Sequence, residues 1–143
     1  MLFRLKKLVP EAKIPVVSPG NVGFDITSVE DKIIYAYSTA VIRTGLQLAE
    51  AHVNDFAFLK VEGRSGLASR GIFPVGGIID PSYRGEIKIV LYNGCEDSYQ
   101  IKKGDRIAQL VCYQVRADDM VIEETTEVTE TERGAPGFGS SGR

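Results

Sequence analysis

The chain has 143 residues, a length that suits one folded domain with a core of its own. Its hydrophobic content of 43% and charged content of 25% are ordinary for a globular protein, and its net charge of −2 gives no basic surface for a nucleic-acid backbone. No apolar run is long enough to span a bilayer. Because the chain lacks both a basic surface and such a run, neither nucleic acid nor a membrane is expected as a partner.

The cysteines and the single histidine narrow the chemistry further. Cys95 and Cys112 make no disulfide framework, and we expect free thiols in a reducing cytosol, hence a cytoplasmic protein. Zinc is not expected, because His52 is the only histidine and no Cys-x-x-Cys spacing occurs. A free nucleotide stays open as a ligand, since a few arginines and backbone amides bind phosphates whatever the net charge.

Short β-type runs follow one another along the chain, separated by glycine and proline. The first run, 2–8, interleaves basic and apolar residues, which predicts an edge strand and not a secretory signal. One helical turn is predicted at 66–70, and 46–53 is ambiguous. Together the runs predict a mostly β single domain, a distorted jelly roll or barrel-like sandwich, with further strands at 24–27, 33–37, 41–48, 57–61, 72–75, 78–80, 86–93, 98–101 and 106–115.

Two early segments carry polar residues that need an explanation. Asp25 lies in an apolar strand, and a buried acid needs an arginine, amide donors or a hydrated metal beside it. We favour an arginine. Arg64, Ser65 and Gly66 follow an apolar strand and predict either an anion-binding turn or a plain surface turn. The spacing is not that of a Walker loop, so no ATPase is indicated.

The segment 76–86 is the strongest candidate for chemistry. Two glycines precede a β-branched pair, and Asp80 and Tyr83 flank a Pro-Ser turn before alternation resumes at Ile87. We therefore expect Asp80 and Tyr83 at the mouth of a β-hairpin. An ordinary turn without chemistry is the alternative.

The last predicted strand begins with a second polar cluster. Gln109 lies among apolar residues, so its amide needs either a ligand phosphate or a backbone group as partner. Asp105 and Arg106 are expected to form a structural ion pair or a turn contact.

Composition changes after Val115. The acidic stretch 118–132 predicts a solvated spacer with some strand pairing. The tail 133–143 sets Arg133, Phe138, Ser140 and Ser141 among glycines. Glycine-rich termini are usually unstructured, but an arginine can grip a phosphate and an aromatic ring can stack on a base. We interpret the tail as a lid.

In this order, these blocks resemble the five motifs of the trimeric dUTP pyrophosphatase (dUTPase) family. The resemblance runs from about residue 22 to the C-terminus. Three positions differ from the usual pattern: Gly63 replaces a proline, Pro74 lies near a position where some members carry a base-contacting side chain, and Ser141 replaces a threonine. The matching motifs are Gly23-Phe24-Asp25-Ile26, Arg64-Ser65-Gly66-Leu67-Ala68, Gly77-Ile78-Ile79-Asp80 with Tyr83-Arg84-Gly85-Glu86, Gly104-Asp105-Arg106-Ile107-Ala108-Gln109-Leu110, and Arg133-Gly134 with Gly137-Phe138-Gly139-Ser140-Ser141-Gly142.

The resemblance implies a homotrimer with shared active sites that hydrolyses dUTP to dUMP and pyrophosphate, limiting uracil in DNA and supplying dUMP for dTMP synthesis. A jelly-roll core over 1–116 and a spacer with a C-terminal arm over 117–143, exchanged between subunits, are implied. Asp80 would activate the attacking water, Tyr83 would exclude a 2′-hydroxyl, and Mg²⁺ would ride on the triphosphate with one of its waters near Asp25. The other implied substrate contacts are Arg64, Ser65, Gly66, Gly77, Ile79, Gln109, Arg133, Phe138, Gly139, Ser140 and Ser141.

Two alternatives remain open at this point. One is a dCTP deaminase, or a bifunctional deaminase–dUTPase, of the same fold. The other is a nucleotide-sensing trimer that regulates a protein partner by contact. The short chain and the arm favour a dUTPase over the first.

Overall fold

The computed structural model describes residues 2–52, 57–115 and 121–131. These residues form ten strands and one short helix. In chain order they are β1 (Leu2–Lys7), β2 (Phe24–Thr27), β3 (Lys32–Ile34), β4 (Thr39–His52), β5 (Ala57–Glu62), α1 (Ser65–Ala68), β6 (Ile72–Pro74), β7 (Ile78–Ile79), β8 (Glu86–Asn93), β9 (Tyr99–Ile101) and β10 (Arg106–Gln114).

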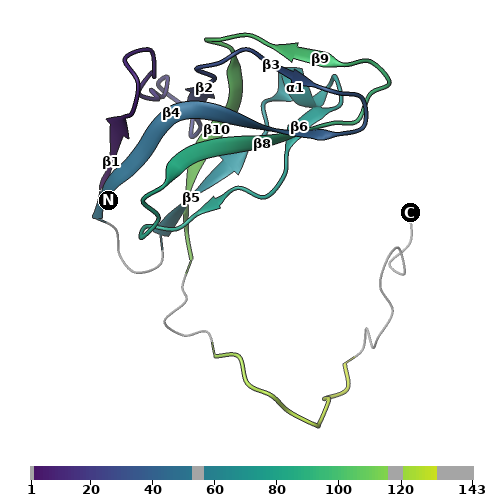
Figure 1. Ribbon diagram of the computed structural model, residues 1–143. Coiled ribbons are helices and arrows are strands. Elements are labelled where there is room, and N and C mark those ends of the chain that lie inside the picture. The colour runs from purple at the N-terminus through teal and green to yellow at the C-terminus, as the bar shows by residue number, and fades with distance from the viewer. Residues whose placement is uncertain (1, 53–56, 116–120, 132–143) are drawn as a thin grey trace.

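Two four-stranded antiparallel sheets lie over one another (Figure 1). The first has the order β1-β4-β8-β6 and the second the order β2-β10-β5-β7, while β3 and β9 form a small separate ribbon. The predicted mostly β class is confirmed, and β1 lies at the edge of its sheet as expected. The part of the chain that the structure describes holds no helix with the length and hydropathy needed to cross a membrane.

The core is built by strands that alternate between buried and exposed residues, as a period of two requires. β5 and β8 follow this alternation along almost their whole length. Each sheet turns a row of branched aliphatic side chains toward the other, and this shared layer is the main apolar cluster. Its fully buried members include Ile26, Ile42, Leu46, Leu48, Ile87, Ile89, Leu91 and Ile107.

The expectation of a hairpin at 78–93 is wrong. β7 pairs with β5 in one sheet, whereas β8 pairs with β4 and β6 in the other, so the intervening turn connects two sheets. The chain enters the second sheet between β6 and β7 at Gly76 and Gly77, whose φ values of +72° and +104° are open to glycine at little cost, and it returns to the first sheet between β7 and β8. Val75 still donates to Val90 O at 3.0 Å, and Gly77 O already accepts from Val61 N at 2.8 Å.

A β-bulge bends the long strand β4 where it passes this turn. The register with β8 shifts between Arg43 and Gln47, and Gly45 adopts a φ of +66°. The Gly45 amide donates to Glu86 Oε1 at 3.0 Å, which ties the bulge to the start of β8. The ambiguous residues 46–52 continue β4 as strand, and Val53 lies outside the described residues.

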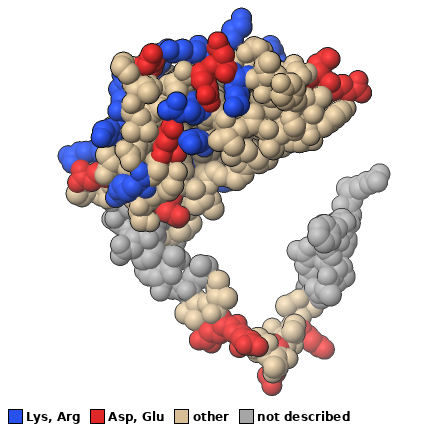
Figure 2. Space-filling view, in the orientation of Figure 1, with Lys and Arg blue, Asp and Glu red and all other residues tan. Residues whose placement is uncertain are grey.

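The described part of the acidic spacer, residues 121–131, contains no strand, so the strand pairing expected there is not found in it. Its apolar side chains are exposed, with Ile122 at 86% and Val128 at 93%. Figure 2 shows acidic residues gathered on this segment, whereas basic and acidic residues are interspersed over the visible face of the sheets. This segment therefore adds nothing to the core.

Asn93 is a buried polar junction whose loss we expect to destabilise the fold. Its Nδ2 donates to Ile34 O, Tyr35 O and Asp97 O at 3.1, 3.3 and 2.8 Å, and its Oδ1 accepts from Cys95 N at 3.0 Å. Asn93→Asp removes the donors at a fully buried position, so the free energy of unfolding should fall by about 2–4 kcal/mol. Chemical denaturation measures this, with exposed Gln114→Glu as the matched control. Equal stability of both variants would contradict the assignment.

Candidate functional site

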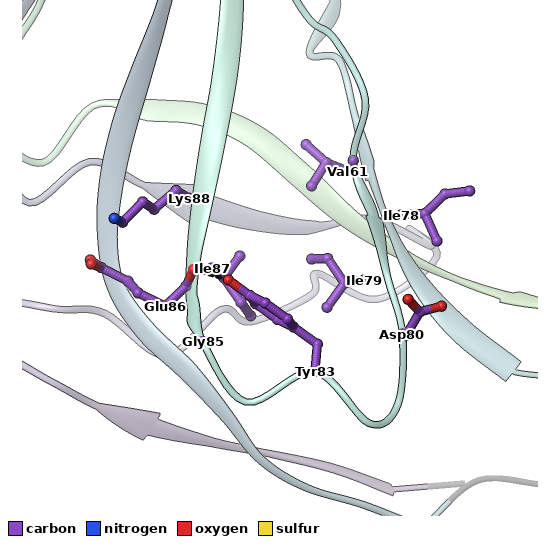
Figure 3. Close-up of a pocket in the computed structure, with 10 residues that line it drawn as sticks. Val61, Ile78, Ile79, Asp80, Tyr83, Gly85, Glu86, Ile87 and Lys88 are labelled. Atoms are coloured by element: carbon purple, nitrogen blue, oxygen red, sulfur yellow. Dashed lines mark hydrogen bonds between the residues drawn. The ribbon is translucent and has the colours of Figure 1, made fainter.

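A cavity of about 460 Å³ lies between β7 and the start of β8, and we name it the Asp80 cavity (Figure 3). It opens because the two strands belong to different sheets. In Figure 3, Ile79 and Ile87 point into the space between β7 and β8, and Tyr83 lies across the mouth of this space. The lining residues are Val61, Gly77, Ile78, Ile79, Asp80, Tyr83, Gly85, Glu86, Ile87 and Lys88.

The walls of the Asp80 cavity are strand edges. β7 is the last strand of its sheet, so its edge opposite β5 carries no further strand among the described residues. On the cavity side, β8 pairs with β6 over residues 91–93, which leaves its first residues without a neighbouring strand there in the described chain. Backbone N–H and C=O groups of such edges are available to a planar ligand. The cavity can therefore read a hydrogen-bonding pattern with main-chain groups.

The turn that carries Asp80 and Tyr83 is held by several hydrogen bonds. Tyr83 N donates to Asp80 O at 3.0 Å, and the Tyr83 hydroxyl donates to Glu86 O at 3.1 Å. Arg84 Nη1 donates to Pro81 O at 2.6 Å, and Gln47 Nε2 donates to Arg84 O. Asp80 is exposed on the cavity rim, while Ile79 beside it is buried. The backbone of Asp80 is thus held at the entrance by a hydrogen-bonded turn, and its side chain is exposed.

A glycine sets the position of the Tyr83 ring. A Cβ atom on Gly85 would overlap the Tyr83 hydroxyl and lie 2.5 Å from Cζ, so the ring packs directly on the Gly85 backbone. Gly77 is constrained in the same way, because its Cβ would lie 2.8 Å from Val61 Cβ. Both glycines are required by close approach, which the sequence pattern alone does not reveal.

The second hollow, of about 730 Å³, is named the Arg64 cavity. It gathers predicted residues from three separate blocks, Asp25, Arg64 to Gly66, and Gln109. Arg106 lines it as well, although the sequence predicts only a structural ion pair or a turn contact for this residue. The complete lining is Val16, Ser18, Gly20, Asn21, Val22, Gly23, Asp25, Arg64, Ser65, Gly66, Arg106 and Gln109.

Asp25 joins two arginines in this cavity, which confirms the predicted arginine partner. Arg64 Nε donates to Asp25 Oδ1 at 2.9 Å, and Arg106 Nη1 donates to Asp25 Oδ2 at 3.2 Å. Asp105 makes the turn contact expected for it, accepting from Lys102 N at 2.9 Å, and it does not pair with Arg106. The Asp25 carboxylate on β2 thus bridges one arginine at the start of β10 and another in the segment after β5.

Gln109 reaches into the same cavity over Gly23. Its Nε2 donates to Gly63 O at 2.8 Å, so a backbone group is one of its partners. A Cβ atom on Gly23 would overlap the Gln109 side-chain oxygen, so Gly23 leaves the room that the amide occupies. The first glycine of the block 23–26 therefore has a steric role.

The two cavities share no lining residue. Val61, near the end of β5, lines the Asp80 cavity, and Arg64, in the segment after the strand, lines the other. One chain therefore presents two separate cavities.

Glu62, the last residue of β5, is a further ionised group on the outer face of the sheet β2-β10-β5-β7. Glu62 accepts from Lys60 Nζ and from the Tyr113 hydroxyl, each at 2.8 Å. The Lys60 and Tyr113 hydrogen bonds hold the pKa of Glu62 below its ordinary value. The same carboxylate raises the pKa of Lys60 and that of Tyr113, so all three groups keep their neutral-pH charge states.

Five of the predicted substrate contacts belong to the C-terminal arm. Arg133, Phe138, Gly139, Ser140 and Ser141 lie outside the described residues. Across residues 2–52, 57–115 and 121–131, no three His, Cys, Asp or Glu side chains cluster to hold a metal ion. Both oxygens of Asp25 accept from guanidinium groups, and the Mg²⁺-bound water expected near Asp25 stays a prediction.

Comparison with known proteins agrees with the fold and with the placement of these blocks. A family model described as dUTPase matches residues 11–142. The deoxyuridine 5′-triphosphate nucleotidohydrolase of Paramecium bursaria Chlorella virus 1 is 43% identical over 140 residues, covering 96% of each chain. The protein of the same name from Nautilia profundicola is 40% identical over 148 residues, covering 100% of each. The solved Staphylococcus bacteriophage 80alpha dUTPase with dUPNHPP is 26% identical, with a TM-score of 0.83 and 99% of each chain covered.

Fold and site define a protein of two antiparallel sheets with a carboxylate beside one cavity and paired arginines beside another. With the match over residues 11–142, the chain belongs to the dUTPase family.

Replacing Gly85 by alanine should move Tyr83 out of the cavity mouth. The added Cβ occupies the place of the phenol ring, so we expect a rotated ring and loss of the Tyr83–Glu86 hydrogen bond. A crystal structure of the variant measures both. Gly94→Ala is the control, because its Cβ meets nothing closer than 3.4 Å. An unmoved Tyr83 in Gly85→Ala would refute the packing argument.

Proposed function

We propose that this protein hydrolyses dUTP to dUMP and pyrophosphate, with Asp80 activating the water that attacks the α-phosphorus. The observation that carries the proposal is the exposed Asp80 carboxylate, held at the rim of a cavity of about 460 Å³ between two open strand edges. Membership of the dUTPase family supports the same reaction. The hydrolysis limits uracil incorporation into DNA and supplies dUMP for dTMP synthesis.

Uracil is recognised by the strand edges of the Asp80 cavity. Its pairing edge presents an acceptor, a donor and an acceptor, whereas cytosine presents a donor at position 4. Backbone groups near Gly77 and Ile79 cannot change their pattern, so cytosine leaves buried groups unpaired at a cost of about 1–3 kcal/mol for each mismatch. Thymine carries a methyl group that uracil lacks, and this group would need additional volume between β7 and the start of β8.

Tyr83 packs against the deoxyribose at the mouth of the Asp80 cavity. Its ring is fixed between Gly85 and the Glu86 carbonyl group, so it cannot retreat from a larger sugar. A 2′-hydroxyl group would meet this ring, which favours deoxyribonucleotides by steric exclusion. Asp80, on the rim beside it, takes the proton from water while the pyrophosphate leaves from the opposite side of the phosphorus.

The phosphates are bound by Arg64, Ser65, Gly66 and Gln109, and a second copy of the chain brings these residues to Asp80. The two cavities share no lining residue, which supports treating each as a half-site that a second copy completes. A homotrimer with shared sites satisfies the requirement by cyclic symmetry. The phage 80alpha relative was solved with dUPNHPP, consistent with a nucleotide ligand here.

Mg²⁺ enters the proposal with the triphosphate. The ion keeps several of its waters and would be held by substrate phosphates. Bound there, it would neutralise charge that develops on the leaving pyrophosphate. Arg64 and Gln109 orient the phosphate oxygens by hydrogen bonds of their own.

The C-terminal arm completes the proposed site. Residues 117–143 would act as spacer and lid after the core of residues 1–116, with Arg133 on the γ-phosphate, Phe138 over the uracil, and Gly139, Ser140 and Ser141 donating to phosphates. A cytoplasmic location remains part of the proposal and is supported by Cys95 and Cys112, which are free thiols.

Asp80→Asn tests the proposed catalytic role. The amide fits the same turn but cannot accept a proton, so kcat for pyrophosphate release from dUTP should fall by about 10³-fold or more while Kd for dUpNHpp changes less than about threefold. The matched control is Asp31→Asn, an exposed acid outside both cavities. Undiminished kcat in Asp80→Asn would refute the role.

The wild-type protein in the same assay should release pyrophosphate from dUTP at least about 10²-fold faster than from dCTP, dTTP or UTP. Ammonia release from dCTP would instead indicate the deaminase alternative. Nucleotide binding without turnover would indicate the sensing trimer.

A further inference from the structure

We infer that Glu86 and Gln47 are positioning residues that set the sugar specificity of the Asp80 cavity, because they hold the backbone that supports the Tyr83 ring. The inference rests on the proposed function and extends it, since the motif resemblance assigns no role to either side chain. Both side chains link the turn to strand β4, none of whose described residues lines the cavity.

The Tyr83 ring rests on the main chain of two residues. It packs on the Gly85 backbone, where an added Cβ would lie 2.5 Å from Tyr83 Cζ, and its hydroxyl donates to Glu86 O at 3.1 Å. The ring is therefore held in place only as firmly as residues 84–86 are. The contacts that fix this short stretch of backbone decide how much room a sugar has beside the ring.

Strand β4 holds this stretch at both ends. At one end, Gln47 Nε2 donates to Arg84 O. At the other end, the Glu86 carboxylate accepts from Gly45 N at 3.0 Å, and both of its oxygens accept from Arg43 Nε at 3.2 Å. The Glu86 side chain is only 13% exposed, so these contacts are better shielded from water than those of a surface ion pair.

The β-bulge of β4 explains why side chains are needed here. The ladder between β4 and β8 is regular up to the pair Arg43–Lys88, and beyond the bulge it resumes with the single pair Gln47–Glu86. A bulge disrupts the ladder locally, so this last pair has few backbone hydrogen bonds to support it. The two side chains add contacts at this point. In Figure 3 the Glu86 carboxylate points away from Ile79, so it supports the turn from outside the cavity.

A purely structural role for these contacts makes a different prediction. If they only stabilise the bulge, their loss lowers the free energy of unfolding and leaves the choice between sugars unchanged. If they position the ring, their loss lets residues 84–86 and the Tyr83 ring move back, and a 2′-hydroxyl group then fits. Asp80 lies before these residues and keeps its own contact from Tyr83 N, so the chemical step should be little affected.

Glu86→Ala tests the positioning role. The ratio of kcat/KM for UTP to that for dUTP should rise about tenfold through KM, while kcat for dUTP changes less than about threefold. Glu86→Gln keeps an oxygen for the Gly45 amide, so the ratio should rise less than about threefold. Calorimetry with dUpNHpp and its ribose counterpart UpNHpp should show the same relative change in Kd without turnover.

Gln47→Ala provides the second variant, because it releases Arg84 O at the other end of the stretch and changes no charge. It should raise the ratio about tenfold as well. Two controls should keep the wild-type ratio. Asn93→Asp lowers the stability at a buried position at the opposite end of β8, and Glu11→Gln breaks an exposed ion pair outside both cavities.

An unchanged UTP-to-dUTP ratio in either folded variant, Glu86→Ala or Gln47→Ala, would overturn the inference, and so would an equal rise in Asn93→Asp. Either result, with a wild-type protein that hydrolyses dUTP, leaves the proposed function standing. A wild type that neither binds dUpNHpp nor releases pyrophosphate from dUTP would refute the proposed function itself.

Discussion

Strand β5 connects the two proposed half-sites, and the proposed chemistry needs groups from both. Val61, near its end, contacts Gly77 and lines the Asp80 cavity, while Arg64 follows the strand into the other cavity. β5 pairs with β7 on one side and β10 on the other, so both ladders fix its place beside the two cavities. In the proposed site a second copy of the chain brings the arginine of one cavity to the carboxylate of the other, as a cyclic oligomer allows.

Each half-site is organised before any ligand arrives. In the Asp80 cavity, backbone hydrogen bonds and close packing on Gly77 and Gly85 fix the turn. In the Arg64 cavity, one carboxylate orders two arginines, and Gly23 leaves space for Gln109. Groups that are fixed in the free protein lose little entropy when they bind a nucleotide. Both cavities are thus preorganised for the proposed substrate.

The sequence alone predicted most strands, because period-two alternation and glycine or proline breaks are local signals. It also marked Asp80, Tyr83 and Gln109, since polar residues in apolar runs stand out. The hairpin prediction failed because the choice of partner for β7 is made by contacts with distant β5, which no local pattern encodes. An ion pair between Arg106 and its neighbour Asp105 is predicted from the sequence, and it is wrong for the same reason. The actual partner of Arg106 is Asp25, which lies 81 residues away. The steric demands on Gly23 and Gly85 likewise depend on tertiary packing.

A complementation experiment tests the shared site most directly. Asp80→Asn and Arg64→Gln each disable a different half-site, and the two proteins are denatured, mixed in equal amounts and refolded together. If a site takes its carboxylate from one copy and its arginine from another, about a quarter of the sites in the mixture are intact, and dUTP turnover recovers to about that fraction of the wild type. A mixture as inactive as each variant refolded alone would show that both residues act within one chain.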